Sequence, residues 1–287
     1  MSRIAYVNGR YVPHFRAMVH IEDRGCQLSD GVYEVMAVRD GAPIDLGPHL
    51  ERLNRSLREI RIEGPVVRGV LATVMREMVW RNRITEGILY LQITRGVAKR
   101  EHAFPTMTDR SLVVTARRHK LPTEAALEKG ISVISVPDTR WYRCDIKAIG
   151  LLPNVLGKQT AKEAGAFEAW MVRENGHVSE GTSSNAWIVT PSGELVTHPA
   201  GPAILSGITR EAVLEVAATL KLPLVERPFT VAEAQAAAEA FLTSTTNFVM
   251  PVIRIDGRPV GSGKPGPITR KLWHGYVARL DRGANSW

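Results

Sequence analysis

The chain has 287 residues, of which 44% are apolar, and its 37 Lys and Arg residues outnumber 29 Asp and Glu residues, giving a formal net charge of +8. This length and apolar content suffice for two domains with hydrophobic cores and exclude disorder of any large part. The two cysteines, Cys26 and Cys144, are far apart and lack metal-ligand spacing, so neither a disulfide framework nor a zinc module is expected.

The first half of the chain is predicted to form a sheet with two helices. Asn8-Gly9 favours a two-residue hairpin turn, because both residue types readily adopt positive φ angles. Apolar residues recur at three- and four-residue spacing in 49–61 and 66–81, which predicts two amphipathic helices. Strands rich in β-branched and large apolar residues are predicted at 4–7, 10–13, 30–38, 87–94 and 111–116, with a polar loop over 95–102.

The second half also mixes strands and helices. A charge cluster followed by Pro122 breaks the pattern, so we expect an N-terminal domain over 1–118, a linker over 119–124 and a C-terminal domain over 125–287. Asn154 is expected to cap a helix that continues to about residue 164, and Thr230 opens a capping box with Glu233. Frequent antiparallel turns favour an α+β fold over a doubly wound sheet. Further strands are predicted at 131–136, 167–172, 184–189, 195–198, 240–246 and 249–255, and further helices at 208–220 and 267–280.

One stretch places a lysine in unusual surroundings. Lys147 follows Arg140 and Arg143 and precedes the apolar run 148–152. An amine held away from water and near cations can lose its proton near neutral pH, attack a carbonyl and form a Schiff base. The same stretch also fits a lysine at a strand end with its head in water, so other residues must decide.

Other segments carry complementary chemistry. Glu180 precedes Gly181 and three small hydroxyl residues, a pattern that suggests backbone held close to a ligand. Gly207-Ile208-Thr209 opens a helix, whose first N–H groups favour a phosphate. Arg52 offers a cation and Thr245 a hydroxyl at a strand end. Each feature alone also fits an ordinary turn, helix start, helix face or strand.

Together these residues meet the needs of pyridoxal 5′-phosphate. Its aldehyde needs an amine, its pyridine nitrogen needs a carboxylate, and its phosphate needs an anion site. Lys147 and Glu180 supply the first two, and the helix N-terminus with Arg52 and the hydroxyls supplies the third.

The segments 144–147, 180–185, 195–197 and 204–210, in this order and spacing, resemble the class IV (fold type IV) pyridoxal-phosphate aminotransferases. The similarity extends from Asn8-Gly9 to the segment 269–272. It implies a small N-terminal α/β sandwich, a larger C-terminal pseudo-barrel and a homodimer.

Within this family the chain is most similar to the D-amino acid aminotransferases, because Tyr33, Arg100 and His102 fall where those enzymes bind the substrate α-carboxylate. Arg100 and His102 are two residues apart, so an extended loop turns both to the same side. With the Tyr33 hydroxyl they supply convergent donors to a carboxylate. Fixing the carboxylate decides which α-hydrogen faces Lys147.

The resemblance also implies roles for individual residues. Lys147 would hold the cofactor covalently and then move the proton at the substrate Cα as general base and acid. Glu180 would pair with the pyridinium nitrogen, Leu205 would pack against the pyridine ring, and Arg140 would border the cofactor or the substrate carboxylate. The phosphate would be held by Arg52, Ile208, Thr209 and Thr245.

The expected reaction is ping-pong transfer of an amino group from a D-amino acid, such as D-alanine, to a 2-oxo acid, such as 2-oxoglutarate. Alternatives within the family are transamination of L-branched-chain amino acids or (R)-amines, and aminodeoxychorismate lyase activity. Net charge alone leaves a basic nucleic-acid- or anion-binding protein as the alternative from another class. The arginines are interspersed with acids and no basic run contains aromatics, which argues against nucleic acid.

The first ten residues lack the apolar core of a signal peptide, and no apolar run is long enough to span a membrane. We therefore expect a soluble cytoplasmic enzyme with small-molecule substrates and no membrane partner.

Overall fold

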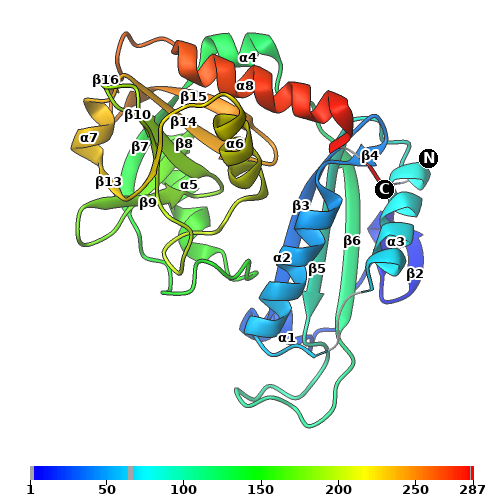
Figure 1. Cartoon of the computed structure of the whole chain (residues 1–287). Helices are drawn as coiled ribbons and strands as arrows, with labels where there is room; N and C mark the ends of the chain where they lie inside the picture. Colours follow the sequence, from blue (N-terminus) through cyan, green and yellow to red (C-terminus); the bar gives the residue numbers. More distant parts are fainter. Residues whose placement is uncertain (1–2, 64–66, 285) are drawn as a thin grey trace. The chain divides into compact units, whose positions relative to one another are not determined.

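The chain forms two compact units, seen in a computed structural model that describes residues 3–63, 67–284 and 286–287 (Figure 1). Unit 1 comprises the residues up to Leu121 together with Ile146–Gly150 and Gly283–Trp287, and unit 2 comprises Pro122–Asp145 with Leu151–Arg282. The short segment that contains Lys147 therefore belongs to unit 1, although the residues on either side of it belong to unit 2. In the described part of the chain, no helix combines the length and the apolar content needed to cross a bilayer.

Unit 1 is built on a six-stranded antiparallel sheet with the order β2-β1-β6-β5-β3-β4. Its strands are β1 (Ile4–Val7), β2 (Arg10–Pro13), β3 (Gly31–Arg39), β4 (Ala42–Pro43), β5 (Gly87–Thr94) and β6 (Ser111–Arg118). Its helices are α1 (Arg24–Leu28), α2 (Leu46–Glu59) and α3 (Arg68–Arg81), with a 3-10 turn, η1, at His14–Arg16. The predicted hairpin turn is confirmed, since Asn8 and Gly9 join β1 to β2 with φ angles of 43° and 88°. Residue 66, the expected first residue of the helix over 66–81, lies outside the described residues.

One face of this sheet packs against α2 and α3. Alternate residues of β3 and β5, such as Val32, Met36 and Leu91, are buried there with Leu53 of α2 and Met75 of α3. Burying each large apolar side chain stabilises the unit by roughly 1.5–3 kcal/mol. The residues between them in the strands point to the opposite face of the sheet.

Unit 2 contains a ten-stranded mixed sheet with the order β12-β11-β10-β14-β15-β7-β8-β9-β13, and β16 pairs with β15. Its strands are β7 (Ile131–Pro137), β8 (Glu168–Val172), β9 (His177–Gly181), β10 (Asn185–Val189), β11 (Leu195–Thr197), β12 (Leu224–Glu226), β13 (Phe229–Thr230), β14 (Glu239–Ser244), β15 (Phe248–Ile255) and β16 (Arg258–Pro259). The sheet curls around a core that includes Val133, Trp170, Ile188, Phe229 and Leu242. Antiparallel pairs predominate in both units, which confirms the α+β prediction.

The helices of unit 2 are α4 (Glu124–Lys129), α5 (Leu152–Glu163), α6 (Ile208–Thr219), α7 (Val231–Gln235) and α8 (Pro267–Arg279), followed by a π-helical turn, η2, at Leu280–Ala284. The Thr230 cap is confirmed, because its hydroxyl accepts a hydrogen bond from the Glu233 N–H at 3.1 Å. The Asn154 cap is wrong. Helix α5 begins at Leu152, since Pro153 suits the first helical turn, and the Asn154 amide instead donates to the Thr182 carbonyl at 2.8 Å.

Candidate active site

Lys147 lies in a segment that extends the free edge of β3. The Tyr33 N–H donates to the Lys147 carbonyl at 3.0 Å, and the Ile149 N–H donates to the Gly31 carbonyl at 3.1 Å. Ile146 and Ala148 pack into the core of unit 1. Because side chains alternate along an extended segment, Lys147 points to the opposite face of the sheet. Sheet pairing thus fixes the backbone of the lysine.

The Lys147 amine lies against an aromatic face. Its Nζ is 4.4 Å from the centroid of the Tyr33 ring, which in turn stacks with Tyr90 at a centroid distance of 5.7 Å. The Lys147 N–H donates to the Ser56 hydroxyl of α2 at 3.3 Å, so the helix supports the segment from the other side. The chain has nine lysines, all among the described residues, and Lys147 is the one that is not exposed.

Arg52 belongs to a buried cluster in the same unit. Its Nε and one terminal nitrogen donate to the two carboxylate oxygens of Glu34 at 2.9 and 2.7 Å. His49, one turn earlier in α2, contacts the same carboxylate at 2.7 Å. Burial raises the pKa of Glu34, but the charge and hydrogen bonds of Arg52 and the hydrogen bond of His49 outweigh it and lower the pKa to about 2. Glu34 is therefore an anion that orients the Arg52 guanidinium.

His49 connects this cluster with Lys147 electrostatically. Burial lowers the pKa of His49, the Glu34 carboxylate opposes that shift, and the charges of Arg52 and Lys147 add to it. The imidazole is therefore neutral at pH 7 and accepts or donates hydrogen bonds without adding a third positive charge.

The three residues expected to bind the substrate carboxylate lie at two places in unit 1. Tyr33 is on β3, beside the Lys147 amine. Arg100 and His102 are exposed residues of the loop between β5 and β6. The structure therefore brings Tyr33 and Lys147 together, and it places Arg100 and His102 on a separate loop of the same unit.

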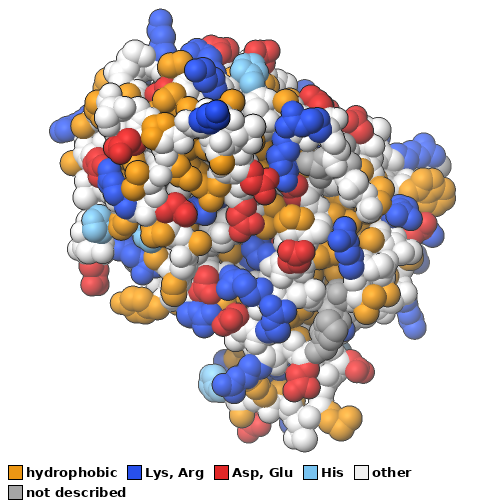
Figure 2. Space-filling model, in the orientation of Figure 1, with side chains coloured by type: hydrophobic (Ala, Val, Ile, Leu, Met, Phe, Trp, Pro, Cys, Tyr) orange, Lys and Arg blue, Asp and Glu red, His pale blue; other side chains and the backbone are white. Residues whose placement is uncertain are grey.

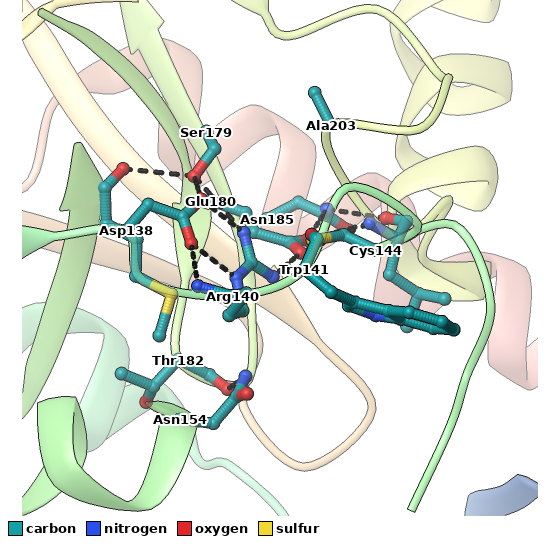
Figure 3. A network of polar contacts seen from close by, with 12 residues as sticks. Asp138, Arg140, Trp141, Cys144, Asn154, Ser179, Glu180, Thr182, Asn185 and Ala203 are labelled. Carbon is teal, nitrogen blue, oxygen red and sulfur yellow. Dashed lines mark hydrogen bonds and ion pairs between the residues drawn. The ribbon is translucent and has the colours of Figure 1, made fainter. Parts of the chain in front are cut away.

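Glu180 lies at the centre of a polar network in unit 2 (Figure 3). Its carboxylate pairs with the Arg140 guanidinium, which also contacts both carboxylate oxygens of Asp138 at 2.9 Å. The Ser179 hydroxyl donates to Asp138 at 2.6 Å and lies 3.2 Å from Arg140. Burial raises the pKa of Asp138, but hydrogen bonds from Arg140 outweigh it and lower the pKa to about 2. Arg140 is thus a bridge between two carboxylates.

Two further donors clamp the Glu180 carboxylate. The Asn185 amide donates to one oxygen at 2.9 Å, and the Leu205 N–H lies 3.2 and 3.1 Å from the two oxygens. The Asn185 amide also donates to the Leu205 carbonyl at 2.8 Å. Burial raises the pKa of Glu180 despite the opposing charge of Arg140. A carboxylate held this firmly, with its negative form disfavoured by burial, is suited to a positively charged partner.

The N-terminus of α6 is buried without a side-chain cap. Gly207 occupies the N-cap position without a side-chain hydrogen bond, and Ile208 and Thr209 are 6% and 4% exposed. A Cβ atom at residue 207 would collide with the Asn185 side-chain oxygen, so only glycine fits. Thr245 is half-buried in the turn after β14, one residue beyond the strand that was expected to contain it.

Several site residues escaped prediction from the sequence. Glu34 pairs with Arg52 and Asp138 pairs with Arg140, two residues already singled out, and His49 pairs with Glu34. Only Glu34 carried a local signal, since it is a carboxylate at an inward position of an otherwise apolar strand. Arg140 and Arg143, which precede Lys147 in the sequence, belong to unit 2, where Arg143 pairs with Asp145 at 3.0 Å.

This fold is that of the fold type IV aminotransferases. The branched-chain amino acid aminotransferase of Escherichia coli superposes with a TM-score of 0.88 at 25% sequence identity, covering 97% of this chain and 94% of that one. The branched-chain enzyme of Thermoproteus uzoniensis, solved with norvaline, gives a TM-score of 0.83 at 30% identity, covering 96% and 94%. Another branched-chain enzyme, solved with pyridoxamine 5′-phosphate, gives 0.88 at 26%, covering 98% and 94%.

The sequence places the chain in the same family. The family model described as amino-transferase class IV matches residues 31–255, so the chain belongs to the class IV aminotransferases, which depend on pyridoxal phosphate. A D-alanine aminotransferase of Bacillus licheniformis is 42% identical over 266 residues, 92% of this chain and 93% of that protein. One of Staphylococcus aureus (strain MSSA476) is 40% identical over 278 residues, 96% and 97% of the two chains. The family resemblance inferred from the motifs is thereby confirmed.

Proposed function

We propose that this aminotransferase moves the amino group of a D-amino acid, with D-alanine as the representative donor, to a 2-oxo acid such as 2-oxoglutarate in a ping-pong cycle. The setting of Lys147 carries the proposal, because this is the one lysine of the chain that is not exposed and its amine lies 4.4 Å from the Tyr33 ring. The D-alanine enzymes are 40–42% identical to the chain over nearly its full length, which favours this donor.

The described residues fit pyridoxal 5′-phosphate at three points. Lys147 offers an amine on a rigid strand-like support, and Glu180 offers a clamped carboxylate. The buried N-terminus of α6 leaves N–H groups that need an acceptor, a need that a phosphate meets. We assign Arg52 and Thr245 to the same phosphate and Leu205 to the face of the pyridine ring, as the family resemblance implies.

When bound, the cofactor supplies an aldehyde that bonds to amines and a ring that withdraws electrons from the substrate Cα. Lys147 removes and returns the proton at that Cα as general base and acid. Glu180 keeps a proton on the ring nitrogen, and Arg140 with Asn185 keeps the Glu180 carboxylate in place. Glu34 orients Arg52. Each task falls to a side chain whose position is set by a strand, a helix or an ion pair.

Tyr33, Arg100 and His102 are assigned to the substrate α-carboxylate. Two cationic or hydrogen-bonding side chains two residues apart, with a phenol on β3, supply the donors that a carboxylate needs. Holding the carboxylate presents one α-hydrogen to Lys147, and stereochemistry follows from that choice.

A panel of three donors tests the proposal. With 2-oxoglutarate as acceptor, D-alanine should be turned over faster than L-leucine or a chiral (R)-amine. Preference for L-leucine would instead indicate the activity for which the solved relatives are named. The variant Lys147→Ala should lose turnover, whereas the exposed Lys271→Ala should retain it.

The panel also separates the enzyme from a basic binding protein. A basic binding protein would bind oligonucleotides with an affinity that depends on salt, and Lys147→Ala would leave that binding unchanged. On the face shown in Figure 2, Lys and Arg side chains are interspersed with Asp and Glu, which favours small-molecule substrates over a nucleic acid.

We further propose a cytoplasmic homodimer. Large apolar side chains are exposed on two segments of unit 1 that a backbone hydrogen bond from the Ala98 N–H to the Glu22 carbonyl brings together. They are Met18 (81%), Ile21 (80%), Phe104 (53%) and Met107 (90%). Such a patch favours contact with another protein surface. Sedimentation at the mass of a single 31.7 kDa chain would contradict the dimer.

A further inference from the structure

The loop over 95–110 joins β5 to β6 and carries Arg100 and His102. Figure 1 shows it extending beyond the ends of the two strands, next to α1. Both side chains are exposed, so packing does not orient them. Their directions therefore depend on how the backbone of the loop is held.

Three charged residues form an anchor at the base of this loop, and we call Arg24, Asp30 and Arg95 the anchor cluster. Arg24 Nε donates to Asp30 Oδ2 at 2.8 Å, and Arg95 Nε donates to the same oxygen at 2.7 Å. The side chains of Arg24, Asp30 and Arg95 are only 3%, 11% and 8% exposed. One carboxylate thus holds two arginines in a mostly dry environment, where such ion pairs have defined geometry.

Arg24 reaches from this cluster to the loop backbone. One terminal nitrogen donates to the Glu101 carbonyl at 2.5 Å and to the Ala103 carbonyl at 3.3 Å, and the other donates to the His102 carbonyl at 3.4 Å. These three consecutive carbonyls include that of His102 and the one directly after Arg100. A single guanidinium therefore sets the backbone at the point where the two carboxylate-binding side chains emerge.

The cluster is itself attached firmly to the sheet. Asp23 caps α1 by accepting from the Gly25 N–H at 2.8 Å, and it also accepts from the Thr94 hydroxyl at the end of β5 at 2.9 Å. Arg95 donates to the Ile60 and Arg61 carbonyls after α2 at 2.6 and 2.9 Å. Arg24 is thus held to β5 through α1 and to the region after α2 through Asp30 and Arg95.

We propose that Arg24 is a positioning residue for recognition of the substrate carboxylate, acting through the loop backbone at 101–103 on Arg100 and His102. The inference rests on the proposed function, because it needs those two side chains to bind a carboxylate. It predicts a selective defect. Loss of Arg24 weakens binding of carboxylate ligands and leaves the cofactor and the chemistry at Lys147 largely intact.

The test compares Arg24→Met, Arg24→Lys and wild-type holoenzyme for the KM of D-alanine, for kcat, and for inhibition by propionate, which has a carboxylate but no amine. Arg24→Met should raise the KM of D-alanine and the inhibition constant of propionate by about ten- to a hundredfold, the effect of losing oriented hydrogen bonds to a charged group. The kcat and the cofactor affinity should change far less. Arg24→Lys keeps the charge beside Asp30 but cannot span three carbonyls, so its values should lie in between.

Arg270→Met is the matched control. It also removes an arginine that pairs with a carboxylate, that of Glu128 at 2.7 Å, and with a carbonyl, that of Pro265 at 2.6 Å, but it lies in unit 2. Both constants should stay at the wild-type values.

A folded Arg24→Met with wild-type constants overturns the inference, as does an equal loss of cofactor affinity, kcat and carboxylate binding, which would mark a general structural role. If Arg24→Met does not fold, Arg24→Lys decides, and unchanged constants there overturn the inference. Wild-type enzyme that neither uses D-alanine nor binds propionate would instead refute the proposed function.

Discussion

Glu34 is fully buried on β3 and pairs with two basic side chains of α2, Arg52 and His49. Removing the Glu34 carboxylate takes away the counter-charge of the buried Arg52 guanidinium in a medium that solvates charge poorly. The charge of Glu34 is therefore linked both to the stability of unit 1 and to the orientation of Arg52.

The low pKa of Glu34 predicts how stability changes with pH. Its pKa is about 2 in the folded chain and 4.5 ordinarily, so the folded state keeps the charge at a pH where the unfolded chain takes up a proton. The stabilisation is complete above 4.5 and is lost as pH falls towards 2. Its size is about 3 kcal/mol at about 1.4 kcal/mol per pKa unit. His49 acts in the same direction below pH 6.5, because burial lowers its pKa.

Denaturant unfolding of wild type and Glu34→Gln across this pH range measures the effect. The difference in free energy of unfolding should shrink as pH falls from 4.5 to 2, because the wild type loses what the variant already lacks. Glu77→Gln, which removes a partly exposed carboxylate paired with Arg81, should change stability by no more than about 1 kcal/mol. A constant difference between wild type and Glu34→Gln over the whole range would refute the assignment.

At the scale of single residues, the sequence singles out residues that stand in local motifs and gives no indication of residues that are defined by a distant partner. Lys147 and Glu180 stood in recognisable motifs. Arg24 and Arg95 did not stand in such motifs, because their shared partner is the Asp30 carboxylate. The segment 101–103, whose carbonyls accept hydrogen bonds from Arg24, is 77 to 79 residues away in the chain. Neither hydrophobic periodicity nor residue spacing indicates a contact between segments so far apart in the chain.

At the level of elements, the start of α6 offers a test of the proposed cofactor site. In Gly207→Ala the added Cβ collides with the Asn185 side chain, whose amide holds both Glu180 and the Leu205 carbonyl. Loss of a hydrogen bond to a charged group corresponds to about tenfold or more in affinity, so apo chain should bind pyridoxal 5′-phosphate at least that much more weakly.

Titration of the cofactor into apo Gly207→Ala and apo Gly201→Ala checks this expectation. Gly201 is the control, because a Cβ there meets no atom within 4 Å and its φ is not positive. If Gly207→Ala bound pyridoxal 5′-phosphate as tightly as the wild type does, the start of α6 would not belong to the cofactor site.

Elements governed by adjacent residues were predicted well. The Asn8-Gly9 turn and the Thr230 cap depend on a few neighbouring atoms, and both are present. The Asn154 cap was wrong because Pro153 starts the helix earlier and the Asn154 amide has a partner in Thr182, a contact that local sequence does not reveal.

At the scale of the whole molecule, the family and the α+β fold followed from motifs spread along the chain. The path that the chain takes between the two units did not follow from these motifs. Ile146–Gly150 joins unit 1 by pairing with β3, although the residues before and after it belong to unit 2. Pairing of an edge strand with a segment more than a hundred residues away is a tertiary contact, and hydrophobic pattern alone does not specify it.

This pairing gives Lys147 its sheltered place beside Tyr33, and the whole account depends on that lysine. Borohydride reduction of the purified holoenzyme, followed by peptide mapping, locates the covalent link between chain and cofactor most directly. We predict a single modified peptide with the cofactor on Lys147. Cofactor attached to any of the exposed lysines, or to none, would contradict the account.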